Sequence, residues 1–442
     1  MRKVILFPAA LFFLAVASPA QALPVRDYIE QAVRLIDRGQ PVFARTFLDP
    51  ALISPLLHSS ERSRAYYLRG YSFLEQHLYR SARLDFNRAL EFNPDNPAAL
   101  LALGRLHQAG QGGEQNPRLA YLLFEKAARL GLPDGQVMLG RALLFGDGVA
   151  KDLWAARRWF GEAAAAGSAN AMLHMAVSYR TPYTDEPFAH NARRWYEKAE
   201  AAGSTDALIA LGEMHARGEF GAANAGRAVA YYRQAAEKGA AEGQVRLAHA
   251  YLRGSGVRRD QQLARQWFAR AGAQGSVAGW LGLGYLAEAG IGQPADAMQA
   301  LDWYRKAALA GDAEGIRRVV GVLIERGTET SHREAVAWLS RLAREGDGKA
   351  ANDCAWLLAT SPHDSVRDGR QAISFAAQAV AVSRTPDRLD TLAAAYAEAG
   401  RFDAAVATEL EALGLVTAAY EHNRAGMSRR LRAYEAGRPW RQ

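Results

Sequence analysis

The chain has 442 residues, of which 49% are hydrophobic and 23% are charged, and this composition is ordinary for a soluble folded protein. Its net charge is +8, and six arginines fall within the last 19 residues. The single cysteine, Cys354, excludes an intramolecular disulfide, so the fold has to be stabilised by packing.

The N-terminal residues carry the features of a secretory signal peptide. Arg2 and Lys3 precede an apolar run at residues 4–17, and Ala20-Gln21-Ala22 places small residues at the spacing of a cleavage site. The apolar run is too short for a membrane-spanning helix. We therefore predict a signal peptide at residues 1–22 and a soluble periplasmic or secreted protein without a transmembrane anchor.

Four kinds of residue recur every 36 positions through six copies. Small-residue pairs stand at Leu103-Gly104, Leu139-Gly140, Met175-Ala176, Leu211-Gly212, Leu247-Ala248 and Leu283-Gly284. Aromatic residues stand at Phe124, Phe160, Tyr196, Tyr232, Phe268 and Tyr304, and alanines stand three residues after each of them. Glycines stand at Gly131, Gly167, Gly203, Gly239, Gly275 and Gly311. A fixed period of this length indicates stacked supersecondary units, that is, a solenoid.

Each unit is predicted to consist of two antiparallel helices. In the second unit, Gln136–Phe145 has apolar residues at helical spacing and ends at glycines, and a second helix runs from about Asp152 to Ala166. The glycine of each small-residue pair lies inside the first helix, where it costs about 1 kcal/mol relative to alanine. Its recurrence predicts a close approach of two helices, with the neighbouring aromatic ring filling the space. The tryptophans beside the aromatic residues are predicted to be interior and to bridge consecutive units: Trp159, Trp195, Trp267 and Trp303.

The repeated pattern reads A-x-x-L-G-x-x-x-x-x-G-x-G-V-x-x-D-x-x-x-A-x-x-W-F-x-x-A-A-x-x-G and fits best at residues 136–169 and 244–277. This pattern resembles the Sel-1-like repeat, a relative of the tetratricopeptide repeat. The resemblance covers residues 97–346 as seven units. It implies an all-α fold, a right-handed α/α superhelical solenoid, and we expect about 70% helix from the periodicity.

Both flanks resemble tetratricopeptide repeats. Residues 25–96 form the N-terminal flank, and residues 350–415 form the C-terminal flank, in which Glu409 stands where an aromatic residue is usual. Residues 416–442 are predicted to be a closing helix and a basic tail. Such terminal units cap a solenoid with a polar outer face, because they cannot bury both of their sides.

The sequence contains no recognisable catalytic constellation. The ten histidines are scattered without metal-ligand spacing, and neither a phosphate-binding loop nor a nucleophile elbow is present. Cys354 lies on an apolar helix face and is interpreted as a small buried hydrophobe rather than a nucleophile. We therefore predict no catalytic residue, no bound metal and no cofactor.

The resemblance also implies a partner-binding face, because the first helix of each pair lines the concave side of tetratricopeptide-type solenoids. The positions one, four and five residues after the small residue give Arg105, Arg141, Arg180, Arg217 and Arg253, with Glu213, His249, Tyr285 and Glu288 beside them. A basic strip of this kind favours an acidic partner, either a peptide or a polyuronate-type polysaccharide. The alternative is a solvated arginine face without a ligand.

The third unit departs from its siblings in the loop between its helices. Residues 180–188 carry two prolines where the other units turn on glycines, and Tyr183 and Phe188 are candidates for exposed contacts. Either family drift or a partner contact explains this loop.

The first functional hypothesis is a non-catalytic envelope scaffold that mediates protein–protein interactions, as the resemblance implies. The alternative is a binder of an anionic exopolysaccharide or cell-wall fragment, or a component of a polysaccharide-secretion complex. A third hypothesis, a hydrolase of cell-wall-like substrates, rests on cysteine-rich relatives whose paired cysteines this chain lacks. Export excludes nucleic acid as a partner. The arginine-rich tail is expected either to bind lipid headgroups or an anionic polymer, or to have no ligand. The partner, the process and the oligomeric state stay open.

Overall fold

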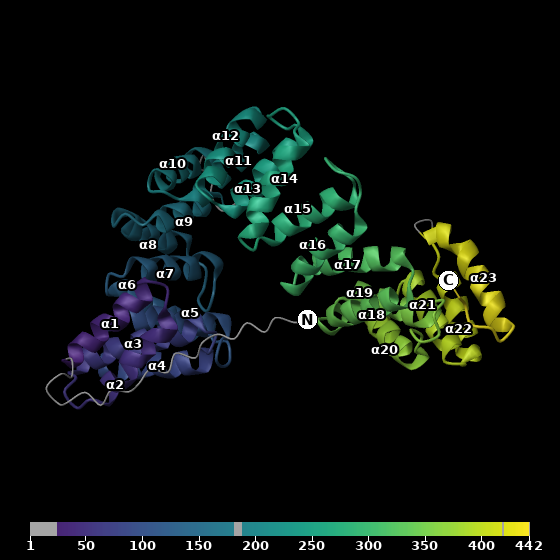
Figure 1. Cartoon of the computed structure of the whole chain (residues 1–442), viewed down its shortest axis with the longest axis horizontal. Helices are drawn as coiled ribbons and strands as arrows, with labels where there is room; N and C mark the ends of the chain where they lie inside the picture. Colours follow the sequence, from purple (N-terminus) through teal and green to yellow (C-terminus); the bar gives the residue numbers. More distant parts are fainter. Residues whose placement is uncertain (1–23, 181–187, 418–419, 442) are drawn as a thin grey trace, which may run out of the picture. The chain divides into compact units, whose positions relative to one another are not determined.

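The computed structural model describes residues 24–180, 188–417 and 420–441, and the side chains of residues 188 and 189 are outside that description. The described residues form 23 α-helices and no strand, and helix makes up 76% of the chain. The predicted all-α solenoid is therefore confirmed (Figure 1). The predicted signal peptide lies outside the described residues. None of the described helices has the length and apolar character that a bilayer crossing needs.

The chain divides into two compact units, and the division falls inside helix α11 (Thr205–Arg217). The first unit consists of Met1–Leu211 and Glu219–Ala222, and the second consists of Gly212–Gly218 and Ala223–Gln442. Before α11, the first unit contains α1 (Val25–Asp37), α2 (Pro41–Ile53), α3 (Ser59–Glu75), α4 (Tyr79–Phe92), α5 (Pro97–Ala109), α6 (Pro117–Arg129), α7 (Pro133–Phe145), α8 (Leu153–Ala165), α9 (Ala169–Arg180) and α10 (Phe188–Ala201).

After α11, the second unit contains α12 (Ala225–Glu237), α13 (Ala241–Arg253), α14 (Gln261–Ala273), α15 (Val277–Glu288), α16 (Ala297–Leu309), α17 (Ala313–Arg326), α18 (Glu329–Arg344), α19 (Gly348–Thr360), α20 (Gly369–Val382), α21 (Pro386–Glu398), α22 (Phe402–Gly414) and α23 (Glu421–Glu435). The odd-numbered helices up to α21 are the first helices of successive pairs. In both units, first helices of consecutive pairs contact each other, as α7 does with α9 and α13 with α15. We call the surface that the first helices share the first-helix face.

The helix boundaries follow from residues that satisfy the free backbone groups. Five second helices of the repeats begin at Asn or Asp residues, whose side chains accept a hydrogen bond from the backbone N–H three residues later at 2.9 Å. These capping residues keep the 36-residue interval: Asn116, Asp152, Asn224, Asp260 and Asp296. The second helices are followed by the glycines of the repeat, which have φ between +81° and +94°. Only glycine adopts this left-handed conformation at no steric cost, so the chain turns there.

The aromatic residues of the second helices form the core of each pair. Phe160 is fully buried, and a Cβ atom added to Gly140 would lie 2.5 Å from its ring. The same close approach joins Gly104 to Phe124, Gly212 to Tyr232 and Gly284 to Tyr304. The predicted packing of a ring on each mid-helix glycine is therefore confirmed.

The tryptophans next to these rings are less buried than predicted. Trp159, Trp195, Trp267 and Trp303 pack against the core clusters but are only half-buried. Each of them carries a cation over the indole face, for example Lys306 Nζ at 3.9 Å from the ring centroid of Trp303. The four rings are therefore not fully interior, because their neighbours one position later point inward. The predicted bridging is seen for Trp195 and Trp267, each of which packs against two core clusters.

The closing helix α23 is held by a buried charged cluster. Arg430 makes two hydrogen bonds to the Asp390 carboxylate, at 2.5 and 2.8 Å, and lies 4.0 Å from Glu409. Glu409 is fully buried, and burial together with the Asp390 charge raises its pKa to about 10. Glu409 is therefore protonated at neutral pH. Burial also raises the pKa of Asp390, which the Arg430 guanidinium opposes.

Candidate binding site

A hollow of about 350 Å³ opens on the first-helix face of the second unit. Its walls come from the C-terminal end of α11, from α12 and α13, and from the turn after α13. We call it the Arg253 hollow, and the side chains that define it are Ala216, Tyr232, Arg246, His249, Arg253 and Ser255.

The hollow exists because a small residue stands above a core ring. In the repeat built from α15 and α16, Glu288 occupies the fourth position after the small residue, and the Tyr304 hydroxyl donates a hydrogen bond to it at 2.7 Å. The equivalent position above Tyr232 is Ala216, which leaves the space over that ring open. Burial raises the pKa of Tyr232, so its hydroxyl stays protonated and can act as a hydrogen-bond donor.

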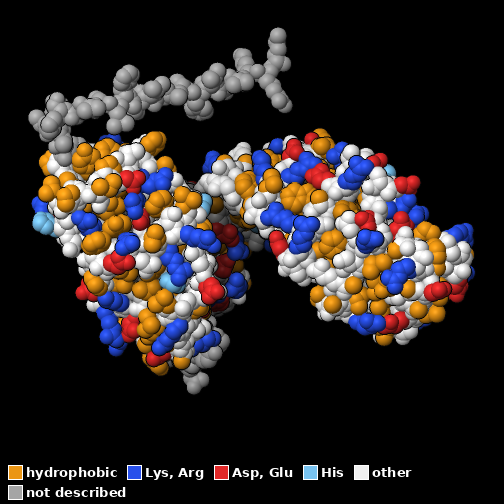
Figure 2. Space-filling model, turned by 90° about the horizontal axis from the view of Figure 1, so that it is seen from below, with side chains coloured by type: hydrophobic (Ala, Val, Ile, Leu, Met, Phe, Trp, Pro, Cys, Tyr) orange, Lys and Arg blue, Asp and Glu red, His pale blue; other side chains and the backbone are white. Residues whose placement is uncertain are grey.

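The charges around the hollow are only partly compensated. Glu213 lies between two arginines, with Arg246 at 2.8 Å and Arg217 at 3.3 Å. Arg246 also pairs with Glu242 at 2.7 Å. Among the described residues, Arg253 makes no hydrogen bond or ion pair. On the face drawn in Figure 2, basic and acidic side chains lie interspersed over each unit. The uncompensated charge of Arg253 is therefore a feature of the hollow and not of a large basic surface.

The imidazole ring of His249 is neutral although it lies among arginines. Its ring meets the ring of Phe268 edge-on at 5.0 Å, and its Nδ1 is buried without a hydrogen-bond partner among the described residues. Burial, and then the charges of Arg253 and Arg246, lower its pKa below the ordinary value. A buried polar atom without a partner is costly, so a ligand that supplies a partner would gain from it.

The structure brings four of the sequence-predicted residues to this region, namely Glu213, Arg217, His249 and Arg253, with Tyr285 and Glu288 further along on α15. Tyr285 is 45% exposed.

The other predicted arginines belong to the first unit and have partners there. Arg105 lies 4.0 Å from Asp134, and Arg180 lies 3.0 Å from Glu219. Arg141 contacts Met138 Sδ at 3.8 Å.

The variant loop of the third repeat is not described. Tyr183 lies outside the described residues, and nothing is described of the Phe188 side chain. Both stay predictions.

Two residues of the hollow were missed in the sequence. Arg246 shares its repeat position with Arg318 of the seventh unit, whereas the other units have Ala102, Met138, His174, Ala210 and Gly282 there. Ala216 was missed because a small residue gives no chemical signal of its own. A comparison of the residues at each repeat position would have drawn attention to Arg246. It would not have shown that Ala216 leaves a space open over the Tyr232 ring.

The described residues contain no group of three or more His, Cys, Asp or Glu side chains placed to hold a metal ion. Burial raises the pKa of Cys354 to about 11, so its thiol stays protonated and is a poor nucleophile. These features agree with the reading of Cys354 as a packing residue.

The chain was compared with curated proteins, with solved structures and with protein families. No curated protein matches the chain. Among solved structures, a protective antigen of uropathogenic Escherichia coli with an SLR fold, c5321, is 24% identical, covers 94% of this chain and 84% of its own, and has a TM-score of 0.46. A Sel1 repeat protein from Oxalobacter formigenes is 29% identical over 55% of this chain and 98% of its own, with a TM-score of 0.45. YrrB, a TPR protein with an unusual peptide-binding site, is 24% identical over 42% of this chain and 92% of its own, with a TM-score of 0.31.

The Sel1 repeat is matched seven times, at residues 97–132, 133–168, 189–204, 205–239, 241–276, 281–312 and 320–347. Proteins built from this repeat generally mediate protein–protein interaction. Four of the matches, which begin at residues 97, 133, 205 and 241, are separated by multiples of the 36-residue interval of the capping residues, the core rings and the helix-ending glycines. The chain belongs to the Sel1 repeat family.

Proposed function

We propose that this protein is a non-catalytic scaffold of the bacterial envelope that binds acidic segments of partner proteins in the Arg253 hollow. The observation that carries the proposal is a cation without a partner, Arg253, beside an open space whose floor is the Tyr232 ring. The tetratricopeptide-like flanks at residues 25–96 and 350–415 are part of the same proposal, as supports for the repeats between them.

The chemistry of the hollow suits a carboxylate. The guanidinium of Arg253 can donate two parallel hydrogen bonds to a carboxylate, and such charge-assisted pairs are stronger when water is partly excluded. The Tyr232 hydroxyl offers a further donor at the floor. A volume of about 350 Å³ is large enough to accommodate an acidic side chain of a partner.

We expect Arg253→Ser to weaken the binding of an acidic peptide about tenfold, because one charge-assisted pair is lost. The measurement is fluorescence anisotropy with a labelled, terminally blocked peptide of alternating glutamate and glycine, compared with its glutamine analogue. Raising the salt concentration should weaken the glutamate peptide only.

A matched control is Arg326→Ser, which removes an exposed arginine from α17 and changes the net charge equally. Equal affinity of the Arg253 variant, the Arg326 variant and the unchanged protein would refute the proposed site. Circular dichroism should show the same helicity for all three, since exposed charges contribute little to stability.

The proposed envelope location rests on the N-terminal sequence. When the full chain is expressed in a Gram-negative host, we expect the protein in the periplasmic fraction with Leu23 as its first residue, because the signal peptide is removed after Ala22. Intact-mass measurement of the fractionated protein tests this. A cytoplasmic protein that retains residues 1–22 would contradict the location.

A further inference from the structure

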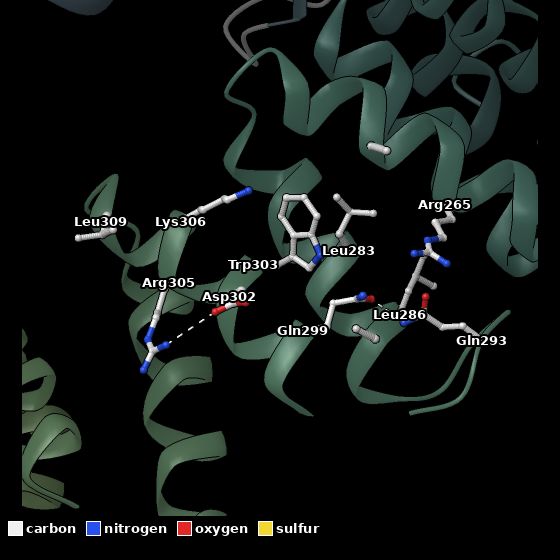
Figure 3. A pocket seen from close by; sticks show the side chains of 12 residues that line it. Arg265, Leu283, Leu286, Gln293, Gln299, Asp302, Trp303, Arg305, Lys306 and Leu309 are labelled. Carbon is white, nitrogen blue, oxygen red and sulfur yellow. Dashed lines mark hydrogen bonds and ion pairs between the residues drawn. The ribbon is translucent and has the colours of Figure 1, made fainter. Parts of the chain in front are cut away.

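A second cavity in the second unit, of about 530 Å³, lies between the second helices α14 and α16 and over the side of α15 (Figure 3). It is a different surface from the Arg253 hollow. Its floor is apolar, with Leu283 and Leu286 buried, and the indole of Trp303 lies beside Leu283. We call this cavity the Trp303 trough.

One wall of the trough is formed by two glutamines. Gln293 stands where two other units have Val149 and Val257, and the same two units have Ala155 and Leu263 at the position of Gln299. The remaining units have Gly113, Asp185 and Gly221 at the first position and Leu119, Asn191 and Arg227 at the second. The Gln293 amide donates a hydrogen bond to Gln299 Oε1 at 2.7 Å. This bond fixes both side chains and leaves the Gln293 oxygen as an acceptor and the Gln299 nitrogen as a donor, neither of which has a partner among the described residues.

The opposite end of the trough also departs from the repeat. Asp302 is the only acid at its position, where the siblings have Leu122, Arg158, Arg194, Ala230 and Gln266. Arg305 next to it is held by two hydrogen bonds to Glu334, at 2.8 and 3.0 Å, and lies 3.7 Å from Asp302.

Two cations of the trough are not neutralised. Lys306 lies over one face of Trp303, with Nζ at 3.9 Å from the ring centroid. Arg265, at the other end, makes no hydrogen bond or ion pair with any residue that the structure describes. Arg305 (+1) is paired with two acids, Asp302 and Glu334 (−2), so with Arg265 and Lys306 (+2) these five side chains have a net charge of +1.

We propose that the Trp303 trough binds an acidic oligosaccharide containing uronic-acid units. An indole face packs against the apolar C–H face of a pyranose ring, and paired amide and carboxylate groups match vicinal hydroxyls, which both donate and accept. The unpaired cations at the two ends suit the carboxylates of successive sugars. The volume lies within the roughly 300–1,000 Å³ of small-ligand sites. This activity is separate from peptide binding and goes beyond the proposed function.

The test is isothermal titration calorimetry of the full-length mature protein with trigalacturonate, with its methyl ester as the neutral control. The informative variant combines Gln293→Val and Gln299→Leu, because the preceding repeat carries this same pair as Val257 and Leu263 and the variant should therefore fold. We expect the double variant to bind trigalacturonate at least tenfold more weakly, and Trp303→Ala to lose binding.

Arg326→Ser serves as the matched control, since it removes one positive charge from an exposed position outside the trough and should leave trigalacturonate binding unchanged. Unchanged binding by the double variant, or absence of binding by the unchanged protein, would overturn the proposal. Equal affinity for the methyl ester would also overturn it, because the ligand would then not be acidic. If the double variant no longer binds the acidic peptide, the trough is a peptide-binding site and not a saccharide-binding site.

Discussion

Replacing Phe160 by Ala is expected to lower the free energy of unfolding of the first unit by about 3–5 kcal/mol. The Phe160 ring is fully buried and fills the space that Gly140 leaves open, so its removal creates a cavity between two helices. Replacing the adjacent Trp159 by Ala is expected to cost only roughly 1–2 kcal/mol, because that ring is incompletely buried and packs at the edge of the core cluster.

The measurement is urea denaturation followed by circular dichroism, which does not depend on the tryptophans themselves. Because the stability of a repeat array is the sum of local terms, the loss should appear in the transition of the first unit and not across the whole chain. The pair Phe268→Ala and Trp267→Ala repeats the comparison in the second unit. A larger loss for the tryptophan variants than for the phenylalanine variants would show that the tryptophans carry the core.

Replacing Glu409 by Gln is expected to stabilise the C-terminal helices at alkaline pH. The folded-state pKa of Glu409 is raised to about 10, whereas the unfolded chain has the ordinary value of 4.5. Between these two values the folded protein binds one proton more than the unfolded chain does. Its stability therefore falls as the pH rises, by about 1.4 kcal/mol per pH unit, and the amide of Gln removes this dependence.

We therefore expect the advantage of the Gln variant to grow steadily as the pH rises from 6 to 8. Urea unfolding at several pH values, read by hydrogen exchange in α21–α23, measures it. Glu411→Gln on the same helix is the control, since Glu411 is partly exposed and pairs with Arg384 at 2.6 Å. A pH-independent difference between the Glu409 variant and the unchanged protein would mean that Glu409 is ionised in the fold.

The same cluster explains a departure that was visible in the sequence. Glu409 was noted as the residue that stands in place of an aromatic side chain of the tetratricopeptide pattern. The pattern could not supply the reason, because Asp390 and Arg430 reach Glu409 from helices 19 and 21 residues away in the sequence. Only the packing of α23 on α21 and α22 brings these three charges together.

The sequence by itself determined the repeat, its two helices, the glycines that end them and the ring that packs on each mid-helix glycine. These features depend on backbone conformation and on contacts within one 36-residue unit, so they recur wherever the residues recur. The division of the chain into flanks and repeats, and the binding role of the arginines, stay predictions.

The tertiary structure decided which of two adjacent aromatic positions points inward. Trp159 and Phe160 are one residue apart, hence about 100° apart around the helix, and spacing alone does not say which of them meets the first helix. The tertiary structure also determined which residues form the candidate sites. Ala216 opens the Arg253 hollow only because Tyr232 lies beneath it, and Glu213 removes charge from Arg217 and Arg246 because α11 packs beside α13. Binding surfaces arise between repeats, and the physical reason that a single repeat does not reveal them is that their side chains come from neighbouring units.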